Sequence, residues 1–246
     1  MEAIGIIPAR YGSTRFEGKV LADLMGKPVI QHVYEMAKKA KTLDDLIIAT
    51  DDERIYKCVE GFGGKAVLTS IDQPTGTDRL TEVVNPIDVK IIVNVQGDEP
   101  LVHYTMIDEL VRTMLEDDSI NMATAIKRVE DKDEIMDPNI VKAVIDKQGF
   151  ALYFSRSPIP FERGAQSKNF YKHLGIYAYT KDFLFTFTNL PKSDLEGIEC
   201  LEQLRALENG YKIKAVETRY NTIGIDTPED LEKARELLLK REEAKK

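Results

Sequence analysis

The chain contains no tryptophan and has only two cysteines and three histidines among 246 residues. The cysteines, Cys58 and Cys200, form no C-x-x-C pair, and the histidines are scattered. This pattern argues against a zinc site, whose ligands usually come in closely spaced pairs. We therefore expect reduced cysteines and a cytoplasmic protein.

The sequence also lacks long hydrophobic runs. No apolar run approaches the roughly 20 residues that a membrane-spanning helix needs, and no basic segment with an apolar core precedes the first apolar run. We expect neither membrane insertion nor a secretion signal.

An excess of positive charge is also lacking, because 34 Lys and Arg stand against 42 Asp and Glu and give a net charge of −8. An acidic chain is a poor partner for nucleic acid. A small anion responds to the local field instead, and residues 1–40 hold six Lys or Arg against four Asp or Glu, a local balance of +2. We therefore expect no nucleic-acid partner but leave room for a nucleotide.

Short apolar runs alternate with helical patterns through the first half of the chain. We expect strands over 45–50, 65–68 and 90–95, and helices over 51–61, 77–84 and 104–116. This alternation predicts a Rossmann-like α/β fold, with a mostly parallel sheet covered by helices on both faces.

The second half changes character. Strand patterns over 141–145, 151–154 and 175–179 follow one another with no helical pattern between them until Lys181. We expect an antiparallel or mixed subsheet inserted into the parallel sheet. With no repeat or linker in sight, we expect a single domain over 1–246, with a strand-rich subregion around 140–190.

Two helices are predicted near the end of the chain. One covers 193–209 and is followed by Gly210, a typical C′ residue. The other begins at Thr227, with Pro228 at the first helical position and Asp230 at N3.

The apolar run that starts at Ile4 breaks at Pro8 into a loop with two glycines and three cationic side chains. Glycine lets backbone N–H groups approach a ligand closely, and Arg and Lys bind phosphate oxygens well. The spacing is not that of a Walker loop. The loop favours polyphosphate binding, with an ordinary solvated turn as the alternative.

Two aspartates follow apolar runs. Asp98 comes just after the run at 90–95, and open α/β sheets bind ligands at the carboxyl ends of their strands. Mg²⁺ prefers carboxylate and phosphate oxygens. Asp226 is the second candidate ligand. A turn or cap is the alternative role for Asp98, and helix capping is that for Asp226.

Two further segments precede helical patterns. Residues 75–79 offer hydroxyl and N–H groups to an anion or a base edge, although capping by Thr77 explains them equally well. Residues 49–52 end in two aspartates and are better explained as a cap.

The strand-rich half holds polar candidates that are weak one by one. Arg156 lies between an apolar run and a proline-stiffened turn, and His173 begins a strand pattern. A lone histidine is more often structural than catalytic. Glu202 and Arg205, at i and i+3, are spaced to pair on a helix surface.

Read in order, these segments resemble the family of 3-deoxy-manno-octulosonate (Kdo) cytidylyltransferases, the CMP-Kdo synthetases. The likeness covers nearly the whole chain. The matching motifs are I-P-A-R-x-x-S-T-R-x-x-G-K at 7–19, A-T-D-D at 49–52, G-T-D-R at 76–79, V-Q-G-D-E-P at 95–100, A-L-Y-F-S-R at 151–156, K-H-L-G-I-Y at 172–177, L-E-Q-L-R at 201–205 and D-T-P-E-D-L at 226–231.

The resemblance implies a fold of the nucleotide-diphospho-sugar transferase type. It also implies transfer of CMP from CTP to the anomeric hydroxyl of Kdo, with release of pyrophosphate, in lipopolysaccharide biosynthesis. Mg²⁺ would be the cofactor, and CTP and a 3-deoxy-ulosonic acid the partners. The resemblance further implies a homodimer, and eight aromatic residues between 150 and 180 suggest that the strand-rich region forms the contact.

The resemblance assigns roles residue by residue. Arg10, Lys19 and Asp98 would be catalytic, and Asp98 and Asp226 would hold Mg²⁺. The nucleotide contacts would come from Pro8, Ala9, Arg10, Arg15, Lys19, Gly76, Arg79 and Gln96. The sugar acid would contact Arg156, His173, Tyr177, Glu202 and Gln203.

The chain departs from the family in three places, the mildest being Thr75, which stands where serine is common and keeps the hydroxyl. Phe16-Glu17 stands where members usually have Leu-Pro, which frees the loop, and the segment 162–169 is short. The alternatives are therefore 8-amino-8-deoxy-Kdo or another ulosonic acid such as a sialic acid. A GT-A-like glycosyltransferase would need a D-x-D motif, which residues 96–98 do not supply. A non-catalytic nucleotide-binding module would not need a sugar-acid pocket.

Overall fold

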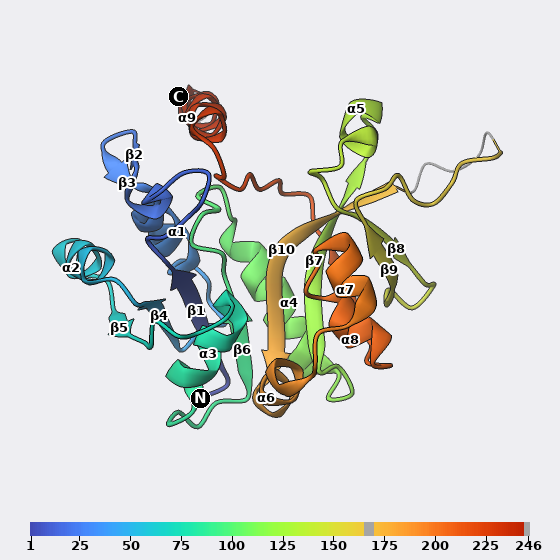
Figure 1. The fold of residues 1–246 in the computed structure, drawn as a ribbon, viewed down its shortest axis with the longest axis horizontal. Helices are drawn as coiled ribbons and strands as arrows, with labels where there is room; N and C mark the ends of the chain where they lie inside the picture. The colour runs from blue at the N-terminus through green and yellow to red at the C-terminus, as the bar shows by residue number, and fades with distance from the viewer. Residues whose placement is uncertain (165–169, 244–246) are drawn as a thin grey trace. The chain divides into compact units, whose positions relative to one another are not determined.

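The computed structural model describes residues 1–164 and 170–243 (Figure 1). The chain divides into two compact units. The first unit comprises residues 1–108 and the C-terminal segment from Asn221, and the second comprises residues 109–220. That residues 1–246 form a single domain stays a prediction. Part of the short segment at 162–169 lies outside the described residues.

The first unit is built on a parallel sheet, as the alternating pattern predicted. Its four strands are ordered β6-β1-β4-β5, and each neighbouring pair runs parallel. The central strands are buried along almost their whole length, which explains why their sequences are continuous apolar runs rather than alternating ones. The strands are β1 (Ala3–Ala9), β4 (Asp45–Thr50), β5 (Ala66–Leu68) and β6 (Ile91–Asn94).

Helices of the first unit begin where side chains cap them. Asp52 caps the helix expected over 51–61, which starts at Glu53 because the Asp52 carboxylate accepts from the Arg54 N–H. The cap expected at Thr77 is wrong. Thr75 caps that helix through a reciprocal box with Asp78. Outside its four-stranded sheet, this unit comprises η1 (Lys19–Leu21), β2 (Asp23–Leu24), β3 (Lys27–Pro28), α1 (Val29–Ala37), α2 (Glu53–Gly61), α3 (Gly76–Val84) and α9 (Pro228–Glu243). Helix α4 (Tyr104–Glu116) leads from the first unit into the second.

The second unit holds the expected mixed subsheet. Strand β10 is antiparallel to both β7 and β8, β8 is antiparallel to β9, and β11 runs parallel to β7. Strand β7 was not predicted, and β10 is longer than the expected 175–179 because a bulge between Leu174 and Tyr177 lets pairing continue. The strands are β7 (Met122–Val129), β8 (Lys142–Ile145), β9 (Ala151–Ser155), β10 (Phe170–Thr180) and β11 (Lys214–Glu217).

The single helix expected over 193–209 is wrong. Cys200 takes the left-handed conformation with φ 52°, which ends α7, and α8 begins only at Leu204. Gly210 follows α8 with φ 80°, as predicted for its C′ residue. The helices of this unit are α5 (Lys132–Met136), α6 (Lys181–Asn189), α7 (Asp194–Glu199) and α8 (Leu204–Glu208).

Among the described residues, no helix combines the length and the apolar character needed to cross a membrane.

We expect the Gly18→Ala variant to lose stability. Gly18 has φ 67°, and an added Cβ would lie 2.9 Å from Cε2 of Tyr11. A non-glycine residue in the left-handed region costs about 1–3 kcal/mol where the structure holds it there. Thermal unfolding of the Gly18→Ala and Gly12→Ala variants tests this, since a Cβ at Gly12 meets no atom within 4 Å. Equal melting temperatures for the two variants would contradict the prediction.

Candidate active site

A cavity of about 310 Å³ lies in the first unit, next to the carboxyl ends of β1 and β6. This is where open α/β sheets place their ligands. Eight of the residues assigned from the sequence line it, as does Thr75 from the candidate segment 75–79, and Gln73 and Pro74 line it without having been predicted as ligands. The predicted residues are Pro8, Ala9, Arg10, Lys19, Gly76, Arg79, Gln96 and Asp98.

The floor of the cavity depends on one glycine. A Cβ at Gly97 would lie 2.8 Å from the Pro8 carbonyl oxygen, closer than real Cβ atoms approach backbone. Glycine therefore allows the segment after β6 to lie against the end of β1. This contact brings Gln96 and Asp98 to the same cavity as Ala9.

The loop between β1 and η1 is held by a backbone hydrogen bond, a cation–π contact and apolar packing. The Gly18 N–H donates to the Tyr11 carbonyl at 2.9 Å, and the Arg54 guanidinium lies over the Tyr11 ring, 3.3 Å from its centroid. Phe16 packs against a buried cluster that includes Leu24 and Leu231. Packing of Phe16 thus holds this part of the loop, where the sequence comparison expected Leu-Pro instead of Phe16-Glu17.

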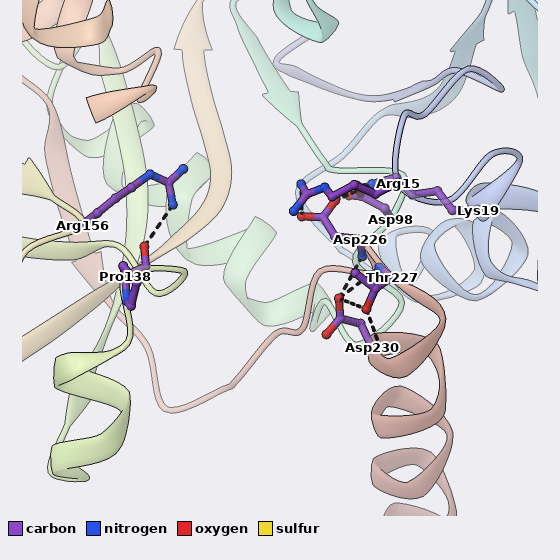
Figure 2. A network of polar contacts seen from close by, with 8 residues as sticks. All are labelled: Arg15, Lys19, Asp98, Pro138, Arg156, Asp226, Thr227 and Asp230. Carbon is purple, nitrogen blue, oxygen red and sulfur yellow. Dashed lines mark hydrogen bonds and ion pairs between the residues drawn. The ribbon is translucent and has the colours of Figure 1, made fainter. Parts of the chain in front are cut away.

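Lys19 bridges the two predicted metal ligands (Figure 2). Its Nζ donates to Asp98 Oδ2 at 2.5 Å and to Asp226 Oδ1 at 2.9 Å. Arg15 Nη2 donates to the other oxygen of Asp226, also at 2.9 Å. Two cations and two carboxylates thus balance each other at the edge of the cavity.

Burial and neighbouring charges determine the protonation states of Lys19 and Asp226. Burial lowers the pKa of Lys19, but the charge and hydrogen bond of Asp98, followed by those of Asp226, outweigh it and leave the pKa above its ordinary value. Burial raises the pKa of Asp226, but Lys19 and then Arg15 outweigh it and leave that pKa below its ordinary value. Lys19 is therefore an ammonium and Asp226 a carboxylate near neutral pH.

The capping alternative for Asp226 is wrong. Helix α9 is capped by Thr227 and Asp230: the Asp230 N–H donates to Thr227 Oγ1 at 3.3 Å, and the Thr227 N–H donates to Asp230 Oδ2 at 3.1 Å (Figure 2). The Asp226 carboxylate accepts from Lys19 and Arg15 instead. Its side chain is thus free of a role in the helix.

Arg79 is buried on the wall of the cavity, with 5% of its side chain exposed. Its Nη2 donates to Asp51 Oδ2 at 2.7 Å, and its Nη1 donates to the Thr69 hydroxyl and to the Ser70 carbonyl. Sequence reasoning missed this role of Asp51, because a strand-ending Asp-Asp pair is explained equally well by capping. The cap is Asp52 alone.

The second unit contains the five residues predicted for the sugar acid. His173 Nε2 shares a hydrogen bond with the Thr124 hydroxyl at 2.8 Å, and its ring contacts Phe154 and Tyr177. Desolvation lowers the pKa of His173 to about 3. The imidazole is therefore neutral, a hydrogen-bonding group rather than a cation.

Arg156 is held by backbone carbonyls. Its Nε donates to the Glu199 carbonyl at 3.0 Å. Its Nη1 donates to the Pro138 carbonyl at 3.1 Å (Figure 2). The Glu199 carboxylate accepts from the Arg156 N–H and from the Ser155 hydroxyl. Sequence reasoning did not single out Glu199, which fixes the start of this turn.

Gln203 and Glu202 lie between α7 and α8. Gln203 is 3% exposed, and its Nε2 has no hydrogen-bond partner among the described residues. The expected pairing of Arg205 with Glu202 occurs as a long ion pair, but Arg205 is buried rather than on the surface. Arg205 is buried and binds Glu196 through two hydrogen bonds of 2.8 and 2.6 Å, whereas the Glu202 carboxylate is 3.9 Å away.

Comparison with known proteins agrees with this geometry. Residues 4–213 match the family model described as Cytidylyltransferase. The chain is 55% identical to the 3-deoxy-manno-octulosonate cytidylyltransferase of Thermodesulfovibrio yellowstonii, over 97% of this chain and 98% of that protein. The chain belongs to the 3-deoxy-manno-octulosonate cytidylyltransferase family.

Solved structures share the fold. The structure of a CMP:2-keto-3-deoxy-manno-octonic acid synthetase complexed with CTP superposes with a TM-score of 0.93 at 43% identity, covering 98% of this chain and all of that one. The 4-diphosphocytidyl-2C-methyl-D-erythritol synthase of Anaerococcus prevotii, 17% identical, has a TM-score of 0.63 and covers 97% and 98% of the two chains. The second likeness concerns the fold alone. Together the two structures confirm the predicted α/β fold of the nucleotide-diphospho-sugar transferase type.

We expect the low pKa of His173 to make the protein less stable in mild acid. Above pH 6.5 the imidazole is neutral in both the folded and the unfolded chain. As the pH falls from about 6.5 toward 3, the unfolded chain binds a proton at His173 that the folded protein does not. The free energy of unfolding should therefore fall, by at most about 1.4 kcal/mol per pH unit from this group.

Denaturant unfolding between pH 4 and 8 measures this dependence. The His173→Gln variant keeps a polar group beside Thr124 but cannot titrate, so its stability should depend less on pH than that of the unchanged protein. Parallel pH profiles for the two proteins would contradict the prediction.

Proposed function

We propose that this nucleotidyltransferase transfers CMP from CTP to the anomeric hydroxyl of 3-deoxy-manno-octulosonate. The hydroxyl oxygen bonds to the α-phosphorus, the bond from that phosphorus to the oxygen bridging to the β-phosphorus breaks, and the hydroxyl proton is released. The products are CMP-Kdo and pyrophosphate. The observation that carries the proposal is the cavity wall, where Arg10, Lys19 and Arg79 face a nucleotide-sized space beside two carboxylates.

The first unit supplies charge for a triphosphate. Arg10 and Lys19 line the cavity. Arg15 forms an ion pair with Asp226, which also binds Lys19. A guanidinium binds phosphate oxygens in a planar fork, and an ammonium acts as a compact point charge. We assign Arg10 and Lys19 to the triphosphate, with Arg15 as a third contact. We assign the base to the part of the cavity lined by Ala9, Arg79 and Gln96. Pro8 and Gly76 line the same cavity.

Asp98 and Asp226 fit a magnesium ion. Each carboxylate has an oxygen within 2.9 Å of the Lys19 ammonium. The two side chains are therefore close enough together to contact one cation. No group of three or more acidic, histidine or cysteine side chains suited to a metal occurs among the described residues. Mg²⁺ commonly uses one or two carboxylates and completes its shell with water and substrate phosphates. When bound, it supplies charge neutralisation and activation of the attacking hydroxyl.

The second unit supplies partners for a sugar acid. Arg156 carries a cation suited to a carboxylate, and Glu202 accepts from hydroxyls. His173 is neutral, and Gln203 keeps an amide N–H₂ group that is satisfied by none of the described residues. Neutral donors and acceptors of this kind suit hydroxyl groups, and with Tyr177 they make up the proposed sugar-acid residues.

The cellular setting and assembly are part of the same proposal. We expect a role in lipopolysaccharide biosynthesis in the cytoplasm, where the free cysteines would remain reduced. A homodimer through residues 150–180 stays an expectation. Its basis is narrower than the sequence suggested, because Phe154, Phe170, Tyr171 and Tyr179 are buried, whereas Phe161 is 85% exposed.

Substrate choice is the direct test of the function. Pyrophosphate release should require CTP together with Kdo, and ATP or GTP should give no turnover. The same assay with 8-amino-8-deoxy-Kdo and a sialic acid separates the ulosonic acids. A glycosyltransferase would release no pyrophosphate, and a binding module would turn over none of the pairs. Equal turnover of a purine triphosphate would refute the proposal.

The two carboxylates should determine metal binding. We expect Asp226→Asn to weaken binding of Mn²⁺, a spectroscopic substitute for Mg²⁺, in the presence of CTP. The loss should be on the order of 10–100-fold, which is typical even for residues that only support a metal ligand. Electron paramagnetic resonance counts the free Mn²⁺ directly and needs no turnover.

Asp230→Asn is the matched control for this experiment. It removes a carboxylate from the same turn, but the Asp230 oxygen accepts from the N–H groups of residues 226 and 227 and from the Thr227 hydroxyl. Its Mn²⁺ affinity should stay close to that of the unchanged protein. An Asp226→Asn variant that binds Mn²⁺ as well as this control would remove Asp226 from the metal site.

A further inference from the structure

Asp51 has a partner that helix capping does not explain. The cap of α2 is the next residue, Asp52, whose Oδ1 accepts from the Arg54 N–H at 2.8 Å. Asp51 instead accepts from Arg79 Nη2 at 2.7 Å, with 16% of the Asp51 side chain and 5% of the Arg79 side chain exposed. The A-T-D-D segment therefore ends in two carboxylates with different partners.

The ends of β4 and β5 complete a cradle around the guanidinium. Thr69 donates to the Thr50 carbonyl from its N–H at 2.8 Å and from its hydroxyl at 3.2 Å. The same hydroxyl accepts from Arg79 Nη1, which also donates to the Ser70 carbonyl at 3.3 Å. The Arg79 guanidinium is thus held in a fixed plane by a carboxylate, a hydroxyl and a carbonyl.

A fixed guanidinium has value for recognising a base. It carries five N–H donors and no acceptor, and the cradle uses three of them on Asp51, Thr69 and Ser70. The side chain also lines the cavity, and the hydrogen bonds of the cradle leave two of the five donors for a ligand there. Both pyrimidines accept at O2, but N3 accepts in cytosine and carries a hydrogen in uracil, so a donor held opposite N3 favours cytosine.

We infer that Asp51 is a positioning residue, which holds Arg79 in the orientation that recognises the pyrimidine of the nucleotide. The inference rests on the proposed function, because it takes the cavity to be the nucleotide site. A free arginine would have to lose its rotamer freedom on binding each nucleotide, and the cradle removes that cost in advance.

Kinetics of Asp51→Asn test the inference. We expect the KM for CTP to rise about tenfold, the effect of about 1.4 kcal/mol of lost hydrogen bonding to a charged group. The KM for Kdo should not change, and the preference for CTP over UTP should narrow. Asp45→Asn is the matched control. It makes the same change at the other end of β4, in the ion pair of Asp45 with Lys65, and should alter none of these values.

A double-mutant cycle separates positioning from general stability. If Asp51 acts through Arg79, Asp51→Asn should add nothing to the KM for CTP in the Arg79→Ala background. A purely structural role would make the two effects additive and would overturn the inference. Thermal unfolding checks each variant, and Thr69→Val, which removes another acceptor of the cradle, should raise the same KM if Asp51→Asn does not fold.

The outcomes also distinguish this inference from the proposed function. If Arg79→Ala leaves the KM for CTP unchanged, the assignment of the nucleotide site fails. If Arg79→Ala raises it while a folded Asp51→Asn or Thr69→Val variant does not, only the positioning role of the cradle is overturned.

Discussion

One ammonium ion ties together the parts of the first unit. Lys19 Nζ contacts carboxylates that lie 79 and 207 residues away in the sequence. Through these contacts the loop after β1, the end of β6 and the approach to α9 meet at one point. Because Lys19 is mostly buried, its charge has to be balanced by groups nearby. The position of the final helix is therefore linked to the same charges that we assign to the phosphates.

Backbone contacts keep that charge cluster in register. Gly97 lets the segment after β6 touch the Pro8 carbonyl, and the Ile225 N–H donates to the Asp98 carbonyl at 2.9 Å. Phe16 and Leu231 pack in the same apolar cluster. The backbone that carries each carboxylate is thus also held by contacts other than the ion pairs.

Local chemistry explains what the sequence could predict. Continuous apolar runs predict the buried strands β1, β4 and β6, and the Thr227 cap predicts the start of α9. Prediction failed where one local pattern has two explanations. Asp51 and Asp52 are both good caps, and only the fold brings Arg79 to the first of them. The end of α7 at Cys200 was also not predicted, because a non-glycine residue in the left-handed conformation does not change the spacing of apolar residues in the sequence. The motifs of the family predicted most of the residues that line the cavity.

The two units differ in the charge they offer, and this difference matches the chemistry of the two substrates. The first unit concentrates fixed cations and carboxylates, and its Lys19 and Asp226 are both held in their charged forms. In the second unit the corresponding polar groups are mostly neutral, since desolvation keeps His173 uncharged and Gln203 is an amide. Strong charges suit a triphosphate, whose binding is dominated by neutralisation. Hydroxyl groups are uncharged, and a protein distinguishes them by the positions of its hydrogen-bond donors and acceptors. We therefore expect hydrogen-bond geometry in the second unit to decide selectivity among ulosonic acids, with Arg156 as the proposed partner of their shared carboxylate.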